Sequence, residues 1–146
     1  MGATMIDHAE IRRLAEELVA AKQRLNAAYR AAARIPRVRE YVLESPSGPR
    51  HLEDLFGTKR DLVVVHNMGR RCVYCTMWAD GLNGLAGPLA DRAAFVLTSP
   101  DPVGVQREFT ASRGWRFPVL STVGTTFAAD MGFERDGDPM PGYSVF

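Results

Sequence analysis

The stretch that decides the fold is Leu62-Val63-Val64-Val65-His66-Asn67-Met68-Gly69-Arg70-Arg71-Cys72-Val73-Tyr74-Cys75. It opens with an apolar, β-branched run, residues 62–66, which is typical of a buried strand. A short loop leads from this run to two cysteines, and the segment 76–80 that follows them favours the start of a helix. These are the only cysteines in the 146 residues, and two residues separate them. The sequence therefore predicts a strand, a loop and a helix, with a Cys-x-x-Cys pair where the helix starts.

The place of this pair favours redox chemistry, because a Cys-x-x-Cys between a strand and a helix is the arrangement of a thioredoxin-like redox centre. The N-terminus of a helix carries partial positive charge and unpaired N–H groups, which lower the pKa of a thiol placed there. Arg70 and Arg71 precede Cys72 and favour its thiolate in the same way. We therefore predict two catalytic residues: Cys72 attacks a substrate disulfide, and Cys75 resolves the mixed disulfide.

Two other interpretations of the cysteine pair stay open. A zinc site would need two further ligands, and the three histidines, His8, His51 and His66, are not spaced like metal ligands. Two buried structural thiols are the second alternative. We predict no metal ion and no cofactor. The predicted partners are a disulfide or thiol substrate, either a protein or a small molecule, and an external thiol that reduces the oxidised pair.

The composition describes one domain of ordinary size, since 146 residues are enough for a core. The 18 Lys and Arg against 17 Asp and Glu give a net charge of +1, which does not favour nucleic acid as a partner. No apolar run reaches the length of a membrane span, and the N-terminus lacks the pattern of a signal peptide. These features predict a cytoplasmic protein with no nucleic-acid and no membrane partner.

We predict two parts, an amphipathic helix within residues 1–36 and an α/β domain in residues 37–146. Asp7 to Glu10 form a capping box for the helix, and Pro36 stops it after about Arg34. Apolar residues recur along it at alternating spacings of three and four. They are Ile11, Leu14, Leu18, Ala21, Leu25, Ala28, Ala32 and Ile35. Such a stripe fits packing inside the domain as well as it fits the contact of a homodimer.

In the second part, segments with strand character alternate with segments with helix character. Strands are expected at 39–44, 62–67, 93–98, 117–121 and 143–146. Helices are expected at 51–56, after Cys75, from an Asp101 cap to Gly114, and at 126–131. This alternation predicts an α/β, thioredoxin-like fold with a mostly parallel central sheet. A thioredoxin-like sheet normally continues beyond such a last strand, so we expect the C-terminal part of the fold to be short.

Four segments carry a resemblance to a known family, the thioredoxin-like proteins catalogued as domain of unknown function 899. They are Leu52–Gly57, Cys72–Gly81, Arg113–Pro118 and Pro141–Phe146. The Cys-x-x-Cys pair followed by Trp-Ala-Asp-Gly is the most specific of them. The resemblance implies a thioredoxin fold related to peroxiredoxins and to thioredoxin-like reductases, and it implies no particular substrate.

The related enzymes supply two mechanisms to compare. Peroxiredoxins carry Pro-x-x-x-Thr-x-x-Cys, and with Cys75 in the place of its cysteine, Cys72 and Met68 replace the threonine and the proline. These departures favour dithiol exchange, and a thiol peroxidase with a peroxidatic Cys75 is the alternative. A third possibility is that the protein is a non-enzymatic binding module.

Thioredoxin-like reductases place a cis-proline opposite the dithiol, and Pro141 is the first candidate, before Pro118.

Several other residues receive predictions from their place near the cysteines. Tyr74 and Arg71 are predicted to contact substrate together with Pro141, although a packed loop aromatic explains Tyr74 equally well. Trp78 is expected to anchor its helix in the core. His66 is expected to be a structural histidine with satisfied hydrogen bonds rather than a proton donor. Asp80 is expected on the solvated side of the helix.

Overall fold

The computed structural model of the protein describes residues 7–32 and 38–146. The chain divides into two compact units, residues 1–39 and residues 40–146. Among the described residues, no helix is both long enough and apolar enough to cross a lipid bilayer.

The described part of the first unit is mainly one helix, α1 (His8–Ala32). Asp7 caps it as predicted, because its carboxylate accepts the N–H of Ala9 at 3.0 Å. Glu10 does not complete the capping box and instead pairs with Arg13 at 2.7 Å. No residue of α1 is buried, and its large apolar residues are between 46% and 65% exposed. The predicted end at Arg34 and Pro36 lies outside the described residues.

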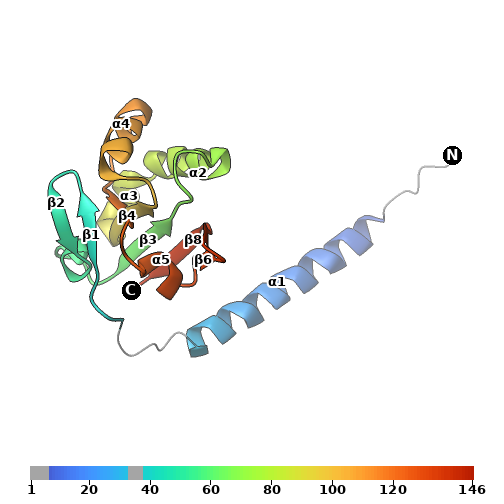
Figure 1. Ribbon diagram of the computed structural model, residues 1–146. Coiled ribbons are helices and arrows are strands. Elements are labelled where there is room, and N and C mark those ends of the chain that lie inside the picture. Colours follow the sequence, from blue (N-terminus) through green and yellow to red (C-terminus); the bar gives the residue numbers. More distant parts are fainter. Residues whose placement is uncertain (1–6, 33–37) are drawn as a thin grey trace. The chain divides into compact units, whose positions relative to one another are not determined.

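The second unit is built on one six-stranded sheet with the order β2-β1-β5-β4-β3-β8 (Figure 1). The strands are β1 (Val42–Ser45), β2 (Gly48–His51), β3 (Leu62–His66), β4 (Ala94–Ser99), β5 (Val119–Ser121) and β8 (Gly142–Val145). Only the pairs β3–β4 and β4–β5 are parallel, while β1 and β8 run antiparallel to their neighbours. The predicted mostly parallel sheet is therefore wrong, and the sheet is mixed. Parallel neighbours need a crossover connection, and helices supply one only between β3, β4 and β5.

The helices of this unit are η1 (Glu53–Phe56, a 3-10 helix), α2 (Val73–Gly84), α3 (Ala86–Arg92), α4 (Val103–Arg113) and α5 (Phe127–Asp130). The helix expected after the cysteines is present as two separate helices, α2 and α3. Gly114 ends α4 in the left-handed conformation, with φ 65°, as predicted. Asp101, however, does not cap α4. Pro102 is the N-cap residue and no side chain caps the helix.

Residues 134–139 form a small hairpin of β6 (Glu134–Arg135) and β7 (Asp138–Pro139), which is not among the strands expected from the sequence. Asp136 and Gly137 connect the strands with φ of 54° and 85°. Two consecutive positive φ angles are the requirement of a tight hairpin turn, and an Asp-Gly pair satisfies it well. This dipeptide was the signal that could have predicted the hairpin.

The two faces of the sheet carry separate parts of the core, because neighbouring residues of a strand point to opposite sides. On one face, α2 and α3 cover an apolar cluster that includes Val65, Phe95, Leu97 and Phe117. On the other face lie Leu62, Val64 and His66, and Phe127 of α5 stacks on His66 with ring centroids 5.5 Å apart. The core thus holds β3 from both sides and fixes the strand that leads to the cysteines.

Candidate functional site

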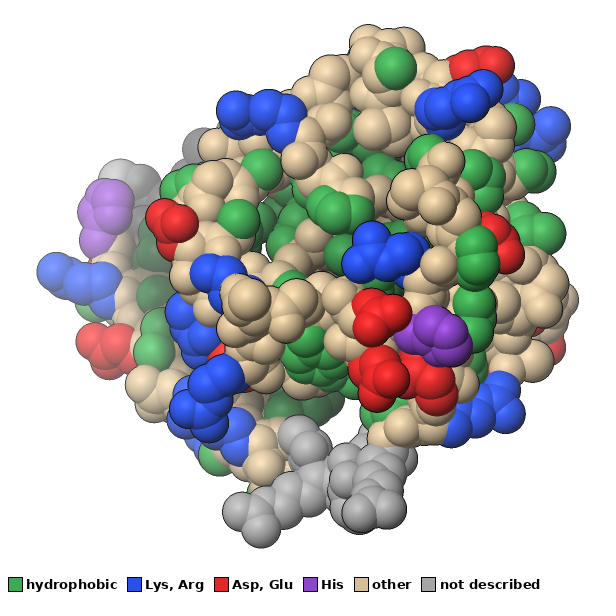
Figure 2. All heavy atoms as spheres, turned by 90° about the vertical axis from the view of Figure 1, so that its left-hand side faces the viewer, with side chains coloured by type: hydrophobic (Ala, Val, Ile, Leu, Met, Phe, Trp, Pro, Cys, Tyr) green, Lys and Arg blue, Asp and Glu red, His purple; other side chains and the backbone are tan. Residues whose placement is uncertain are grey.

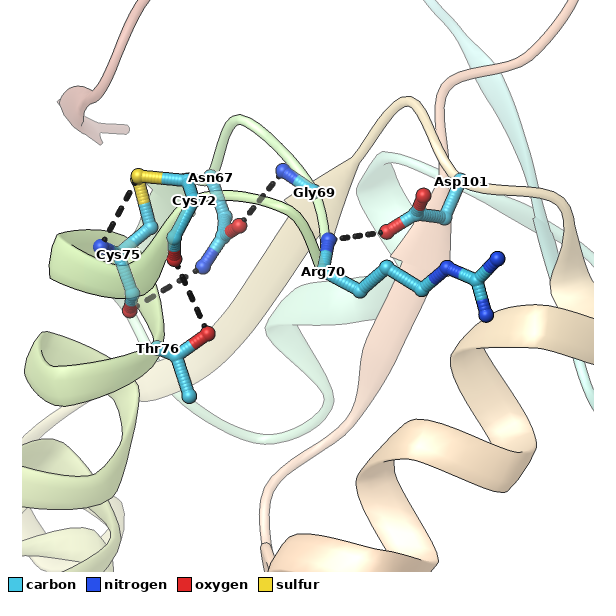
Figure 3. The surroundings of a disulfide bond; sticks show 7 residues. All are labelled: Asn67, Gly69, Arg70, Cys72, Cys75, Thr76 and Asp101. Atoms are coloured by element: carbon cyan, nitrogen blue, oxygen red, sulfur yellow. Dashed lines mark hydrogen bonds between the residues drawn. A yellow bond between two sulfur atoms is a disulfide. The ribbon is translucent and has the colours of Figure 1, made fainter.

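The two cysteines meet at the start of α2, where they form a disulfide with their Cα atoms 5.2 Å apart (Figure 3). Cys72 is the N-cap residue of α2 and has an extended backbone. Its sulfur accepts the backbone N–H of Cys75 at 3.1 Å. In the reduced protein the same donor and the positive end of the helix would stabilise a thiolate on Cys72.

The two sulfur-bearing side chains differ in access to solvent. Cys75 is 4% exposed and counts among the buried core residues. Cys72 is only half-buried. An incoming disulfide therefore reaches Cys72 more easily than Cys75, and Cys75 is placed where a resolving thiol is needed.

The loop before Cys72 is held by Asn67, a residue for which the sequence predicted no role. Asn67 is 8% exposed. Its side-chain oxygen accepts the N–H of Gly69 at 2.8 Å, and its amide nitrogen donates to the carbonyl of Cys75 at 3.4 Å. Asn67 thereby links the end of β3 to the first turn of α2. An asparagine directly after a buried strand was the available sequence signal.

Asp101 supports the same loop from the end of β4. Its carboxylate accepts the backbone N–H of Arg70 at 2.7 Å (Figure 3). Gly69 has φ 95°, and a Cβ at this position would lie 3.0 Å from the Asp101 carboxylate, so the loop can approach Asp101 this closely only with glycine. This contact replaces the helix cap that the sequence predicted for Asp101.

The predicted arginines differ in their orientation and placement. In Figure 3 the Arg70 side chain extends away from the disulfide, on the side of Asp101. Its charge therefore acts on Cys72 from a greater distance than its sequence position suggested. Arg71 is exposed and directly precedes Cys72.

The candidate substrate residues Tyr74 and Pro141 come from different elements. Tyr74 is 76% exposed on the first turn of α2, so it is not a packed loop aromatic. Pro141 precedes β8, whose Gly142 pairs with His66 at the end of β3. Pro118 instead precedes β5. The described residues contain no cis peptide bond, so the expected cis-proline is wrong for both Pro141 and Pro118.

Apolar side chains are exposed on α2 beside the disulfide and on the neighbouring edge strand β8. Trp78 is 43% exposed, which corrects its prediction as a core anchor. Its ring stacks on Tyr143 of β8 with centroids 6.2 Å apart. The exposed residues of this surface are Val73, Tyr74, Met77, Trp78, Tyr143 and Val145.

His66 is buried behind the cysteine loop and is only partly hydrogen-bonded. Its Nε2 lies 2.8 Å from the hydroxyl oxygen of Ser144, while its Nδ1 is buried without a partner among the described residues. The ring is stacked between Phe127 and Phe133, and its centroid lies 4.0 Å from that of Phe133. Burial lowers the pKa of His66 to about 4. His66 is therefore structural and neutral at pH 7, but the expectation of fully satisfied hydrogen bonds is wrong.

A zinc interpretation of the cysteine pair receives no support from the residues that the structure describes. No group of three or more His, Cys, Asp or Glu side chains is close enough to hold a metal ion within these ranges. The pair is joined as a disulfide instead.

Asp80 connects α2 to the end of α4. Its carboxylate forms an ion pair with Arg113 and accepts the indole N–H of Trp115 at 2.8 Å. The hydrogen bond from Arg113, followed by that from Trp115, lowers the pKa of Asp80. The sequence predicted that Asp80 lies on the solvated side of its helix. In the structure Asp80 instead links α2 to the end of α4 through Arg113 and Trp115.

We expect Asp80→Ala to lower the free energy of unfolding by about 1–2 kcal/mol, because the half-buried Trp115 N–H loses its acceptor. Asp80→Asn keeps an oxygen for Trp115 and should lose less than half of that. Urea unfolding of both variants measures the difference. Equal losses in the two variants would show that the ion pair with Arg113, rather than the indole hydrogen bond, carries the effect.

Three solved structures that are similar to this chain share its fold. The peroxidoxin BcpB from Mycobacterium tuberculosis is 32% identical, with a TM-score of 0.62 over 71% of this chain and 70% of that chain. Peroxiredoxin Q from Xanthomonas campestris is 19% identical, with a TM-score of 0.61 over 73% of this chain and 72% of that one. A candidate protein disulfide isomerase from Bacteroides thetaiotaomicron is 15% identical, with a TM-score of 0.58 over 75% and 69%.

The last two likenesses show the fold alone, which is thioredoxin-like. None of the curated proteins matches this sequence. The family model of bacterial proteins of unknown function, DUF899, matches residues 3–145. This match spans nearly the whole chain and includes the Cys72–Cys75 pair, so the protein belongs to the DUF899 family.

Proposed function

We propose that the protein is a thiol-disulfide oxidoreductase that works through the Cys72–Cys75 dithiol. The observation that carries this proposal is the Cys72 sulfur at the N-cap of α2, where it accepts the N–H of Cys75 at 3.1 Å. The greater burial of Cys75 supports the division of roles between the two thiols.

The reaction begins when the Cys72 thiolate attacks one sulfur of a substrate disulfide. A bond forms between that sulfur and Cys72, and the other substrate sulfur leaves as a thiolate. The Cys75 thiol then loses its proton to the departing sulfur and attacks Cys72. The second substrate thiol is released, the substrate has gained two electrons, and the Cys72–Cys75 disulfide remains. An external dithiol reverses these steps and returns the protein to its reduced form.

Exposed apolar side chains near Cys72 support a substrate that carries apolar groups beside its disulfide. Tyr74 and Val73 are each 76% exposed, and Met77 is 58% exposed. Contact with such groups would remove apolar surface from water. A polypeptide disulfide meets this requirement, and so does a small disulfide with an apolar body. Arg71 and Pro141 remain candidate contacts.

Two activity measurements on the intact chain test the proposal. The protein should accelerate the reduction of insulin disulfides by dithiothreitol, and it should consume hydrogen peroxide no faster than its Cys75→Ser variant. Fast peroxide turnover that depends on Cys75 would replace the proposal with a thiol peroxidase. Inactivity in both assays, with thiols that stay reduced under mild oxidant, would leave a non-enzymatic binding module.

The thiol peroxidase is a second candidate because of the 32% identity to a peroxidoxin. If Cys75 takes the place of the cysteine in the peroxiredoxin motif, Cys75 would be the peroxidatic residue. Two observations weigh against it: Cys75 is 4% exposed, and its N–H is already bonded to the Cys72 sulfur. A peroxide would have to enter the space that the disulfide now fills.

We also propose that the chain forms a homodimer through α1. Leu14, Leu18 and Leu25 lie on the predicted stripe and are 50%, 65% and 53% exposed. A second copy of the helix would cover them in the manner of a coiled coil. Light scattering at tens of micromolar should give twice the mass of the chain.

Changing these three leucines to glutamate should return the mass to that of one chain. The matched control changes three polar residues of α1, Arg12, Glu16 and Gln23, to alanine and should leave the dimer intact. A monomeric wild-type chain, or a leucine variant that still dimerises, contradicts the proposal.

A further inference from the structure

A cavity of about 750 Å³ lies in the second unit, away from the cysteine loop. It is bordered by the β1–β2 hairpin, by η1 and by α3 and α4, and no residue from 60 to 85 lines it. Figure 2 shows the face that bears the hairpin, which is hollowed near its centre, with hydrophobic side chains in the hollow. The volume falls in the range of about 300–1,000 Å³ that is usual for sites of small molecules.

The wall of the cavity is mainly apolar. Leu55 and Phe56 come from η1, Ala90 from α3, and Phe95 and Phe117 from the sheet and the segment before β5. Phe95 and Phe117 meet edge to face with centroids 5.3 Å apart. An aromatic or aliphatic body could therefore lose its contact with water here.

The charged residues that line the cavity are all cations. They are Arg50, Lys59, Arg107 and Arg116, and no Asp or Glu of the described residues belongs to the wall. Lys59 donates to the carbonyl oxygen of Asp91 at 3.0 Å, and Arg116 donates to that of Asn83 at 3.3 Å. These acceptors are neutral. Among the residues that the structure describes, Arg50 and Arg107 have no carboxylate partner.

Two residues of α4 carry a buried side-chain oxygen without a hydrogen-bond partner among the described residues. Gln106 is 3% exposed, and its amide nitrogen donates to Ser99 and Leu120, whereas its side-chain oxygen has no partner among the described residues. The hydroxyl of Thr110, one turn further along α4, is likewise buried and unpaired. Both residues line the cavity. Buried polar groups gain most from a partner when nothing else pairs them.

We propose that this cavity binds a small amphipathic anion, with an aromatic or aliphatic body in the apolar part and one acidic group beside Arg50 and Arg107. A neutral apolar ligand would leave the four cationic side chains of the wall without an acidic partner. Arginine favours carboxylate and sulfonate groups because its planar fork can donate two parallel hydrogen bonds. The site uses neither cysteine, so it stands apart from the proposed redox function.

The probe for this site is 1-anilinonaphthalene-8-sulfonate, and N-phenyl-1-naphthylamine serves as a neutral partner with the same aromatic body. Titration of the intact chain, followed by fluorescence and calorimetry, should show saturable binding of the sulfonate. Arg50→Gln combined with Arg107→Gln should weaken the sulfonate about tenfold, the effect of about 1.4 kcal/mol. Binding of the neutral amine should stay unchanged. Decanoate should displace the sulfonate from the wild-type chain.

Two controls locate the binding. Arg12→Gln combined with Arg135→Gln removes two arginines that do not line the cavity and should leave the affinity for the sulfonate unchanged. Ala90→Phe adds a ring to the wall and should weaken both probes. If the sulfonate binds equally well to the Arg50 and Arg107 variant and to the Ala90 variant, it binds to other exposed apolar surface and the proposal is wrong. Thermal unfolding of each variant confirms that it is folded.

Discussion

Cys72→Ser should lower the rate of insulin reduction by about three orders of magnitude or more, because the attacking thiolate is lost and no other cysteine is exposed enough to replace it. Cys75→Ser should fail in a different way. It retains the Cys72 thiolate at the N-cap of α2, so it should still attack a disulfide. The reaction should then stop at the mixed disulfide, since the resolving thiol is absent.

Mass spectrometry of each variant after exposure to a glutathione disulfide or an insulin fragment measures this difference. Cys75→Ser should gain the mass of one substrate thiol, which dithiothreitol removes, and Cys72→Ser should gain little. Glu108→Gln, at an exposed residue of α4 away from the cysteine pair, is a control and should behave like the wild type. Faster adduct formation on Cys75 than on Cys72 would assign the attack to Cys75 and favour a thiol peroxidase in which Cys75 is the peroxidatic residue.

The local part of the site was predictable from the sequence. The strand 62–66, the N-cap position of Cys72 and the helix after it depend on neighbouring residues, and the structure contains all three. An apolar β-branched run and a capping geometry act within a few residues, so one sequence carries their signal. The left-handed Gly114 at the end of α4 was predictable for the same reason.

The contacts that hold the site from a distance were not predictable. Asp101 bonds to the N–H of Arg70, and Trp78 stacks on Tyr143, and both contacts join elements that are far apart in the chain. Hydrophobicity placed Trp78 in the core because a tryptophan usually buries much of its surface. The mixed sheet was missed because strand direction follows from the pairing of β8 with β3, which no local pattern encodes.

One glycine shows how packing behind the site constrains the edge strand. A Cβ at Gly142 would overlap the ring of Phe133. That ring is stacked on His66, which pairs with Gly142 in the β3–β8 register. The segment after Pro141 can therefore reach the end of β3 only because residue 142 has no side chain. The stacking of Phe133 on His66 and the pairing of β8 with the end of β3 thus both depend on glycine at residue 142.

His66 should make the stability of the protein depend on pH below 6.5. In the unfolded chain its pKa is near the ordinary histidine value of 6.5, while in the folded protein burial lowers the pKa to about 4. As the pH falls from 6.5 toward 4, the unfolded chain binds a proton that folded His66 excludes. The stabilisation is therefore complete above pH 6.5 and declines through this window. The loss between pH 7 and pH 4 should be about 3 kcal/mol.

Urea unfolding at pH 7, 5.5 and 4 measures this loss, and His66→Phe removes the titrating group while keeping an aromatic ring beside Phe127 and Phe133. The variant loses the contact with Ser144 and should therefore be less stable than the wild type at pH 7. Between pH 7 and pH 4, its free energy of unfolding should decline by about 3 kcal/mol less than that of the wild type. Ser112→Ala, at an exposed residue of α4, removes no titrating group and should follow the wild type. Parallel curves for wild type and His66→Phe would mean that His66 binds its proton in the folded protein. The imidazole would then need an acceptor or a water at Nδ1, the nitrogen that the surrounding aromatic rings leave unpaired.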